Sequence, residues 1–322
     1  MRPLRTAFAG ALLGVLVLAG CGQTTGTDSG ATASVNPSSG GSAASPAGAF
    51  PVTVQAGNGS VTIPARPQRI VSLSPTATEN LFAIGAGPQV VAVDDQSTYP
   101  EQAPRTSLSG FKPNVEAIAG QRPDLVVLSD DIGGVVAELG KLRVPVLLEP
   151  SAKKLEESYD QIADLGAATG NTANAAKVAG DMKRKLDELA AAAPKDKKLT
   201  YYHELDTTPY AATSGTFIGQ IYAMFGLVNI ADEAPDAAGG YPKLSAEFVA
   251  KADPDLIFLA DVKCCGQSRD TLAKRPGWSG LAAVRDDHVV QLDDDIASRW
   301  GPRVADFAQT VAAAVQKAAA AE

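Results

Sequence analysis

Ser151 and Lys154 come nearest to the spacing of a catalytic motif. They fit S-x-x-K, in which the serine of penicillin-binding enzymes is the nucleophile. The S-D-N and K-T-G partners of this motif are missing from the sequence, and so are G-x-S-x-G, H-E-x-x-H and the P-loop. We therefore expect Ser151 to cap a helix starting near Lys154. No catalytic residues are expected, and a serine-type hydrolase is a remote alternative.

Cys264 and Cys265 are adjacent and can form a disulfide with one another. A disulfide between neighbours closes a small, strained ring and is uncommon, and here it would stiffen the turn before Gly266. We favour this vicinal disulfide; two free thiols, or a thiol contact with the metal of a bound ligand, are the alternatives. The two histidines, His203 and His288, are far apart in sequence, so we expect no histidine-rich metal site.

The composition limits the classes of partner. The chain has 322 residues, enough for two domains, and 45% of them are hydrophobic, so a packed core is expected. The formal net charge is −8. An acidic chain without a Lys/Arg cluster argues against a nucleic-acid partner and against adhesion to anionic lipid through basic side chains.

Residues 1–21 have the features of a secretory signal, with Arg2 and Arg5 before a short apolar core. The segment ends in Leu-Ala-Gly-Cys21, which resembles the bacterial lipobox, whose cysteine receives lipid and becomes the mature N-terminus. The resemblance implies a lipid anchor on the extracytoplasmic face of the cell membrane; an ordinary signal peptide with a stray cysteine is the alternative. Residues 22–49 are mostly Ser, Gly, Ala and Thr and are expected to be a flexible tether.

A unit of glutamate, short helix, Pro-Asp-Leu and apolar strand occurs twice. The copies are NVEAIAGQRPDLVVLS, from residue 114, and KLSAEFVAKADPDLIFLA, from residue 243. Glu116 and Glu247 each stand seven positions before the proline of their copy, and they are 131 positions apart. The matched spacing indicates one structural unit used in two lobes. The helix dipole also favours an acid near a helix start, so local stabilisation is the alternative reason for each glutamate.

One long helix is expected between the two copies, at Asn171–Ala193, because good helix formers dominate it and Met182 and Leu186 share an apolar face. On either side, strands alternate with helices, which predicts parallel sheets with helices on both faces. The expected strands lie at 69–74, 90–94, 125–129, 144–148, 199–204, 256–260 and 289–292. We predict an α/β fold with a lobe at 50–170, the helix at 171–194 and a second lobe at 195–322.

The stretch RIVSLSPTATENLFAIGAG, from Arg69 to Gly87, resembles the solute-binding proteins of ABC importers for cobalamin, haem and iron–siderophore complexes. The resemblance continues over most of the chain, through VVAVDDQSTYPEQA, RPGWSGLAAVRDDHVVQLDDD and SRWGPRVADF. It implies two α/β lobes joined by one rigid backbone helix, with a ligand cleft between them. SLSPTATE, Tyr99-Pro100 and RPGW…GPR are most similar to the cobalamin-type members.

The resemblance further implies a lipid-anchored monomer, without a cofactor or metal of its own, that delivers a metal chelate to an ABC permease and its ATPase subunits. Cobalamin is the first ligand expected and a ferric siderophore the second. Haem is third, because no histidine or tyrosine pair stands out as an axial ligand set. A structural or adhesive lipoprotein is a further alternative that would need neither paired lobes nor a cleft.

In this family the ligand lies between the lobes, and the resemblance assigns aromatic side chains to the loops that line it. Flat rings can stack on or enclose a corrin, porphyrin or catecholate ligand, although loop aromatics also close the ends of lobes as core. The candidates are Tyr99 and Phe111 in the first lobe and Tyr210, Tyr241 and Trp300 in the second.

Charged residues have two expected roles. Arg299 and Arg303 offer guanidinium groups to an anionic ligand, although Arg303, early in the last helix, could equally pair with an acid of the fold. In this family one surface carboxylate per lobe docks into arginine pockets of the permease, and the resemblance assigns this role to Glu116 and Glu247. Such contacts would orient the complex and steer its formation.

Overall fold

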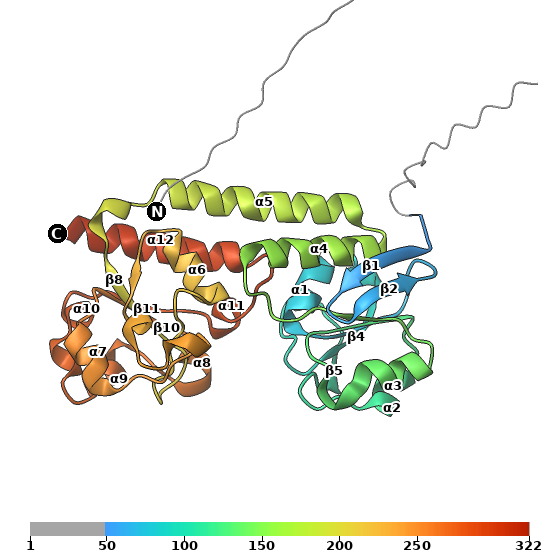
Figure 1. Ribbon diagram of the computed structural model, residues 1–322, viewed down its shortest axis with the longest axis horizontal. Helices are drawn as coiled ribbons and strands as arrows, with labels where there is room; N and C mark the ends of the chain where they lie inside the picture. The colour runs from blue at the N-terminus through green and yellow to red at the C-terminus, as the bar shows by residue number, and fades with distance from the viewer. Residues whose placement is uncertain (1–48, 322) are drawn as a thin grey trace, which may run out of the picture. The chain divides into compact units, whose positions relative to one another are not determined.

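The computed structural model describes residues 49–321; the predicted signal segment, Cys21 and the predicted tether up to residue 48 lie outside this range. Two parallel sheets, each with its own helices, lie under three long helices (Figure 1). The predicted α/β architecture with two lobes is therefore confirmed. Within residues 49–321, no helix combines the length and apolar composition that crossing a membrane requires.

The first lobe is built on a five-stranded parallel sheet with the strand order β5-β4-β3-β6-β7. Its core strands are buried along their whole length, as expected when helices cover both faces. The strands are β3 (Ile70–Leu73), β4 (Val90–Asp94), β5 (Arg105–Leu108), β6 (Leu125–Leu128) and β7 (Val146–Leu148). Its helices include α1 (Pro75–Ala83), α2 (Val115–Gly120) and α3 (Val135–Lys141).

The second lobe is built on a four-stranded parallel sheet with the order β11-β10-β8-β9. The strands are β8 (Thr200–Glu204), β9 (Val228–Asn229), β10 (Leu256–Leu259) and β11 (Val289–Gln291). The helices are α6 (Phe217–Ala223), α7 (Ala246–Ala252), α8 (Val262–Cys265), α9 (Arg269–Ala273), α10 (Ala282–Arg285) and α11 (Asp294–Ala297).

The sequence did not predict β5 and β9, and both are edge strands. β5 has the polar sequence RTSL with two exposed residues, and β9 has only two residues. An edge strand is covered less than a central one, so it lacks the continuous apolar run by which the other strands were predicted.

The duplicated unit has a structural counterpart in both lobes. The carboxylate of Asp124 accepts hydrogen bonds from the backbone N–H groups of Gln68 and Arg69, at 2.8 Å each. Its counterpart Asp255 accepts one from the backbone N–H of Thr200 at 2.7 Å. In each lobe the Pro-Asp-Leu aspartate therefore ties the start of its own strand to the start of the neighbouring strand, β3 or β8.

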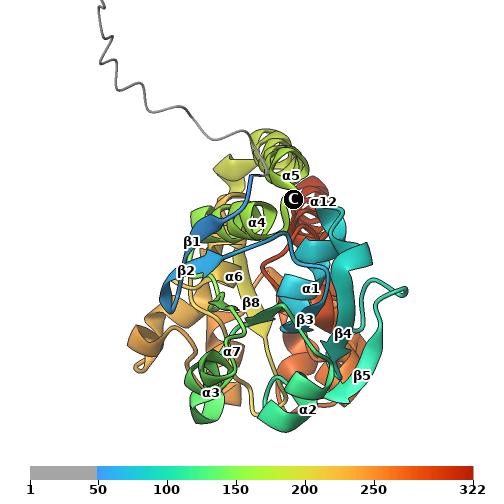
Figure 2. The same cartoon turned by 90° about the vertical axis from the view of Figure 1, so that its right-hand side faces the viewer.

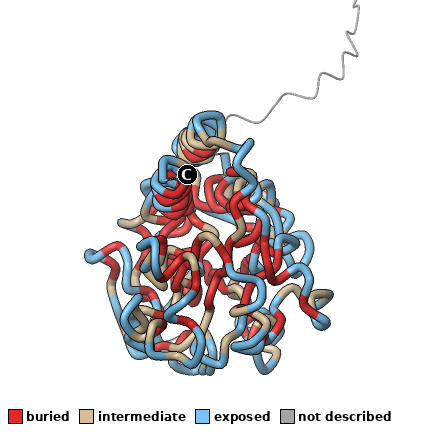
Figure 3. The backbone as a smooth tube through the Cα atoms, turned by 90° about the vertical axis from the view of Figure 1, so that its left-hand side faces the viewer, coloured by how far each residue is buried: buried red, intermediate tan, exposed pale blue. Residues whose placement is uncertain are grey.

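Three long helices form the layer above the two sheets: α4 (Leu155–Thr169), α5 (Thr172–Ala191) and α12 (Val304–Ala321). The predicted backbone helix is α5, and it packs along both α4 and α12 (Figures 1 and 2). It buries Met182 and Leu186 on its inner face, while its outer face is exposed (Figure 3).

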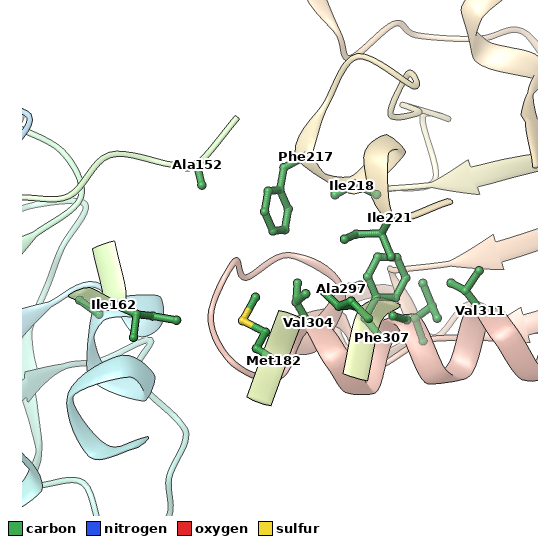
Figure 4. Packing of buried hydrophobic residues seen from close by; sticks show 14 of the residues in the cluster. Ala152, Ile162, Met182, Phe217, Ile218, Ile221, Ala297, Val304, Phe307 and Val311 are labelled. Atoms are coloured by element: carbon green, nitrogen blue, oxygen red, sulfur yellow. The ribbon is translucent and has the colours of Figure 1, made fainter. Parts of the chain in front are cut away.

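One apolar cluster runs through both lobes and the helical layer. It includes Ile162 of α4, Met182 of α5, Phe217 of α6 and Val304 and Phe307 of α12 (Figure 4). Separating the lobes would expose this close-packed cluster, which costs free energy in proportion to the apolar area exposed. The packing of this cluster therefore opposes separation of the two lobes.

An antiparallel hairpin is formed by β1 (Val52–Ala56) and β2 (Gly59–Ile63). The side chain of Asn58 at its tip donates to the carbonyl of Val146 at 3.0 Å and accepts from the N–H of Leu148 at 3.1 Å. A Cβ atom on Gly57 would lie 2.9 Å from the Leu148 carbonyl oxygen, so this close approach requires glycine. The hairpin thus covers the open edge of β7.

Candidate ligand-binding site

Loops from the strand ends of both sheets meet between the lobes. The hydroxyl of Thr98, in the loop after β4, donates to Asp295 of α11 at 3.1 Å. The side-chain amide of Gln220 on α6 donates to the backbone carbonyl of Lys153 at 2.5 Å. Ligands of open α/β sheets bind in the crevice outside the carboxyl ends of the strands. The edge where the lobes meet is therefore the candidate site.

A pocket of about 430 Å³ lies at this edge, a volume suited to a small molecule. The first lobe contributes Ser151, Ala152 and Lys153 from the loop after β7. Second-lobe residues complete its lining: Thr213, Gly215, Thr216, Phe217, Ala237, Gly239, Gly240 and Tyr241. The lining includes no carboxylate, and Lys153 is its single charged residue.

The prediction that Ser151 caps a helix was wrong. Lys154 occupies the N-cap position of α4, and no side chain caps that end. Instead, the N–H of Lys153 donates to Glu157 Oε2 at 2.7 Å. This contact lies at the start of α4 in place of a serine cap. The Ser151 side chain is exposed and lines the pocket.

Four of the five predicted aromatic side chains are exposed at strand-end loops. Tyr99 follows β4 and is 47% exposed, and Phe111 follows β5 and is 69% exposed. Tyr210 follows β8 and is 41% exposed, and Tyr241 follows β9 and is 50% exposed. Across residues 49–321, no other Phe, Tyr or Trp side chain is exposed. The exposed aromatic rings of the described residues therefore lie in segments that follow strands, two in each lobe.

The Tyr210 and Tyr241 segments lie side by side in the second lobe. The N–H of Ala211 donates to the carbonyl of Pro242 at 3.0 Å, and that of Leu244 donates to the carbonyl of Pro209 at 3.1 Å. Burial raises the pKa of the Tyr241 hydroxyl, so it remains a neutral donor at physiological pH.

Arg299 and Arg303 make their contacts within the fold. Arg299 is 8% exposed and donates to Glu79 Oε1 of α1 at 2.7 Å and to Asp295 Oδ1 at 2.9 Å. Arg303 donates to both oxygens of Glu79, at 2.8 and 2.5 Å. Its guanidinium carbon lies 4.2 Å from the centre of the Tyr99 ring. One first-lobe carboxylate therefore holds two arginines that follow the last strand of the second lobe.

Trp300 is half-buried between these arginines and α4. Its indole N–H donates to Gln161 Oε1 at 2.8 Å, and its backbone carbonyl accepts a hydrogen bond from the Ser158 hydroxyl. Its ring packs against the apolar cluster shared by the lobes. The segment from Arg299 to Arg303 thus fastens the second lobe to α1 and α4 of the first.

Buried acids at the strand ends are a feature that the sequence analysis missed. Asp94 ends β4, Glu149 follows β7, Glu204 ends β8 and Asp261 follows β10. Burial raises the pKa of Asp94, and it raises that of Glu149 to about 8. Glu149 is therefore protonated at neutral pH. The signal available in the sequence was an acid directly after each apolar run.

Glu204 and Asp261 differ in their partners. Glu204 accepts two hydrogen bonds from Arg275 at 2.6 Å each and one from the Tyr202 hydroxyl at 3.1 Å. Within residues 49–321, no protein donor reaches either carboxylate oxygen of Asp261. Burial, and then the charge of Glu204, raises the pKa of Asp261 to about 7. At the carboxyl ends of β8 and β10, the charge of Glu204 is therefore paired with Arg275, and the raised pKa of Asp261 lowers its negative charge near neutral pH.

Cys264 and Cys265 are paired as a disulfide on the one-turn helix α8, and both residues are exposed. Gly266 ends α8 at a φ of +66°. The two histidines lie apart: His203 is fully buried and shares a 2.7 Å hydrogen bond with the Tyr222 hydroxyl, while His288 precedes β11. Residues 49–321 contain no cluster of three or more His, Cys, Asp or Glu side chains able to hold a metal ion.

Glu116 and Glu247 occupy matching positions. Each lies in the first turn of its helix, α2 or α7, and is exposed. The capping groups are Asn114, which accepts from the N–H of Ala117, and Ser245, which accepts from that of Phe248. Within residues 49–321, neither glutamate side chain forms a hydrogen bond or an ion pair. Other side chains therefore cap both helices, while the helix dipole still favours an acid in the first turn of each.

Residues 70–296 match the family model described as periplasmic binding protein. The chain belongs to this family. The resemblance seen in the sequence is thus confirmed at the level of the family. Because this is a family of binding proteins, the hydrolase alternative is excluded.

Individual relatives extend the comparison. The chain is 29% identical to the uncharacterized ABC transporter substrate-binding lipoprotein YvrC of Bacillus subtilis over 320 residues, 96% of each chain. It is 30% identical to the vitamin B12-binding protein of Vibrio cholerae over 253 residues, 76% of this chain and 87% of the relative. Its structure is similar to the periplasmic heme-binding protein RhuT from Roseiflexus sp. RS-1, at a TM-score of 0.68 and 25% identity, over 79% of this chain and 99% of that one.

Proposed function

We propose that this binding protein is the substrate-binding component of an ABC importer and that it captures cobalamin between its two lobes. The observation that carries the proposal is the placement of its exposed aromatic rings. Tyr99 and Phe111 belong to the first lobe and Tyr210 and Tyr241 to the second, and each is exposed in a segment that follows a strand of its own sheet. A large, rigid macrocycle suits such a site because it can contact rings from both sides at once.

The polar lining of the site favours a ligand with little net charge. Arg299 and Arg303, the charged candidates from the sequence, already bond Glu79, so an anion would have to compete with a buried carboxylate for them. Cobalamin offers amides and a single phosphodiester, and Lys153 at the pocket can serve one such anionic group. A ferric siderophore is the second ligand we propose and haem the third; the haem-binding relative supports keeping haem on the list.

Trp300, Arg299 and Arg303 support the site in this proposal by holding the lobes at a defined separation. The shared apolar cluster adds to this stiffness, so we expect only modest closure around a ligand. A preformed site loses less conformational entropy on binding than one that must close.

We further propose that Glu116 and Glu247 dock the loaded protein onto its permease. Their exposed, matched positions on α2 and α7 put one free carboxylate on each lobe. Lipidation of Cys21, which the lipoprotein relative supports, would anchor the protein at the extracytoplasmic face of the membrane, close to that permease.

Calorimetric titration of the fragment from Phe50 onward, which carries both lobes, tests the ligand. Tight one-to-one binding of cyanocobalamin would support the proposal. Binding of a ferric siderophore or of haem instead would retain the transport class and overturn cobalamin as the ligand. If none of this panel of cyanocobalamin, ferric siderophores and haem binds, a metal chelate is the wrong class of ligand.

A further inference from the structure

The one-turn helix α8 depends on contacts outside itself. With four residues, it has few internal hydrogen bonds, and helices of this length are unstable alone. The carboxylate of Asp294 accepts from the backbone N–H groups of Val262, Lys263 and Cys264, at 3.0, 2.9 and 3.0 Å. The disulfide between Cys264 and Cys265 is the second restraint on the backbone of α8.

A short chain of contacts leads from this disulfide to the other lobe. The Lys263 ammonium donates to Asp293 Oδ1 at 2.7 Å and to Asp295 Oδ2 at 3.3 Å. The same oxygen of Asp295 accepts from the Thr98 hydroxyl of the first lobe at 3.1 Å. Thr98 directly precedes Tyr99, one of the exposed rings at the candidate site. The geometry of α8 is therefore coupled to a first-lobe loop through one carboxylate.

We propose that the Cys264–Cys265 pair is a thiol–disulfide site open to dithiol reductants, and that its redox state controls the order of α8 and its bridge to Thr98. Both cysteines are exposed, so a reagent can reach the sulfurs. Breaking the bond removes a covalent restraint and leaves Asp294 as the main support of a four-residue helix. The proposal concerns the protein alone and does not depend on which ligand it binds.

The Cys264–Cys265 disulfide is reduced by two successive thiol–disulfide exchanges with one external dithiol. A thiolate of the external dithiol attacks the Sγ atom of one cysteine, the S–S bond breaks, and the other cysteine leaves as a thiolate. The second thiol of the reagent then attacks the mixed disulfide, closes the reagent's own disulfide and releases the first cysteine. Two electrons pass to the protein, and the two protons of the reagent's thiols end on Cys264 and Cys265.

Alkylation with iodoacetamide, read by intact mass, tests the first half of the proposal. Without reductant we expect no modification at Cys264 or Cys265. After native treatment with dithiothreitol, each should carry one carbamidomethyl group. Modification without reductant would show free thiols, and absence of modification after native reduction would show a pair closed to dithiols; either result overturns the proposal.

Hydrogen–deuterium exchange tests the second half. In the reduced protein the amides of Val262, Lys263 and Cys264 should exchange about tenfold faster, because α8 opens more often. Amides of the buried strand β6 should be unchanged, which shows that the protein stays folded. The double variant Cys264→Ser/Cys265→Ser is the matched control, with fast exchange at α8 whether or not dithiol is added. Equal exchange of oxidised and reduced wild type would overturn the coupling.

Discussion

The carboxylate of Glu79 and the guanidinium of Arg299 lie 2.7 Å apart, although 220 residues separate them in sequence. Glu79 belongs to the SLSPTATE stretch and Arg299 to the SRWGPRVADF stretch, two of the stretches that carry the resemblance to the family. Arg303 shares the same carboxylate. These two stretches therefore meet in one buried ion-pair cluster that joins the lobes.

Glu79→Gln should destabilise the protein by about 3 kcal/mol, because it removes the charge that compensates two largely buried arginines. Denaturant unfolding measures this as a lower midpoint. The matched control is Lys183→Gln, which breaks an exposed ion pair with Asp187 on α5 and should leave the midpoint nearly unchanged. Equal midpoints for Glu79→Gln and wild type would contradict a stabilising role for the cluster.

Tyr241→Ala and Phe111→Ala should each weaken ligand binding about tenfold, because each removes a ring from the site. Calorimetry with the ligand identified by the panel gives the affinities. Leu142→Ala is the control: Leu142 is 53% exposed but follows α3, away from the strand ends. Unchanged affinity in both aromatic variants would remove these rings from the site.

Reversing the charge of the docking pair with Glu116→Lys/Glu247→Lys should abolish uptake in reconstituted membranes while leaving ligand affinity intact. The side chains face solvent, so folding and the ligand site are untouched. Glu156→Lys/Asp270→Lys is the matched control, because both residues are exposed acids in the first turn of a helix, one in each lobe. Normal uptake by the docking variant would disprove the docking role.

Stability should fall as pH rises, owing to Glu149. Burial raises its pKa from 4.5 to about 8, so the folded state holds this proton more tightly than the unfolded chain does. The stabilisation is complete below about pH 4.5 and is lost as pH rises through 8. Glu149→Gln should remove this part of the pH dependence and be more stable than wild type at pH 9, by at least about 1 kcal/mol.

Thermal and denaturant unfolding between pH 4 and pH 9 measures this difference. Asp130→Asn is the control, because that aspartate follows β6 in the same lobe but is exposed. Parallel stability curves for wild type and Glu149→Gln would show that Glu149 titrates normally.

Local patterns in the sequence were sufficient to predict the central strands and the long backbone helix of this fold, but not the edge strands β5 and β9. Apolar runs marked the central strands, and β4 begins and ends where the sequence predicted. The spacing of Glu116 and Glu247 indicated the duplication, which appears in the structure as matching aspartates, Asp124 and Asp255, at matching strands. The resemblance to the family pointed to the loops that carry the exposed aromatic rings, although Trp300, the fifth candidate, is half-buried.

The partners of charged side chains were decided by the tertiary structure. The sequence offered Arg299 and Arg303 to a ligand, but the fold brings Glu79 to them from the other lobe, and a guanidinium bonded to a buried carboxylate is already satisfied. The raised pKa of Glu149 likewise arises chiefly from burial, with a contribution from the charge of Asp164 on α4. Long-range contacts set both outcomes, because desolvation and charge pairing depend on which side chains share a volume and not on their order along the chain.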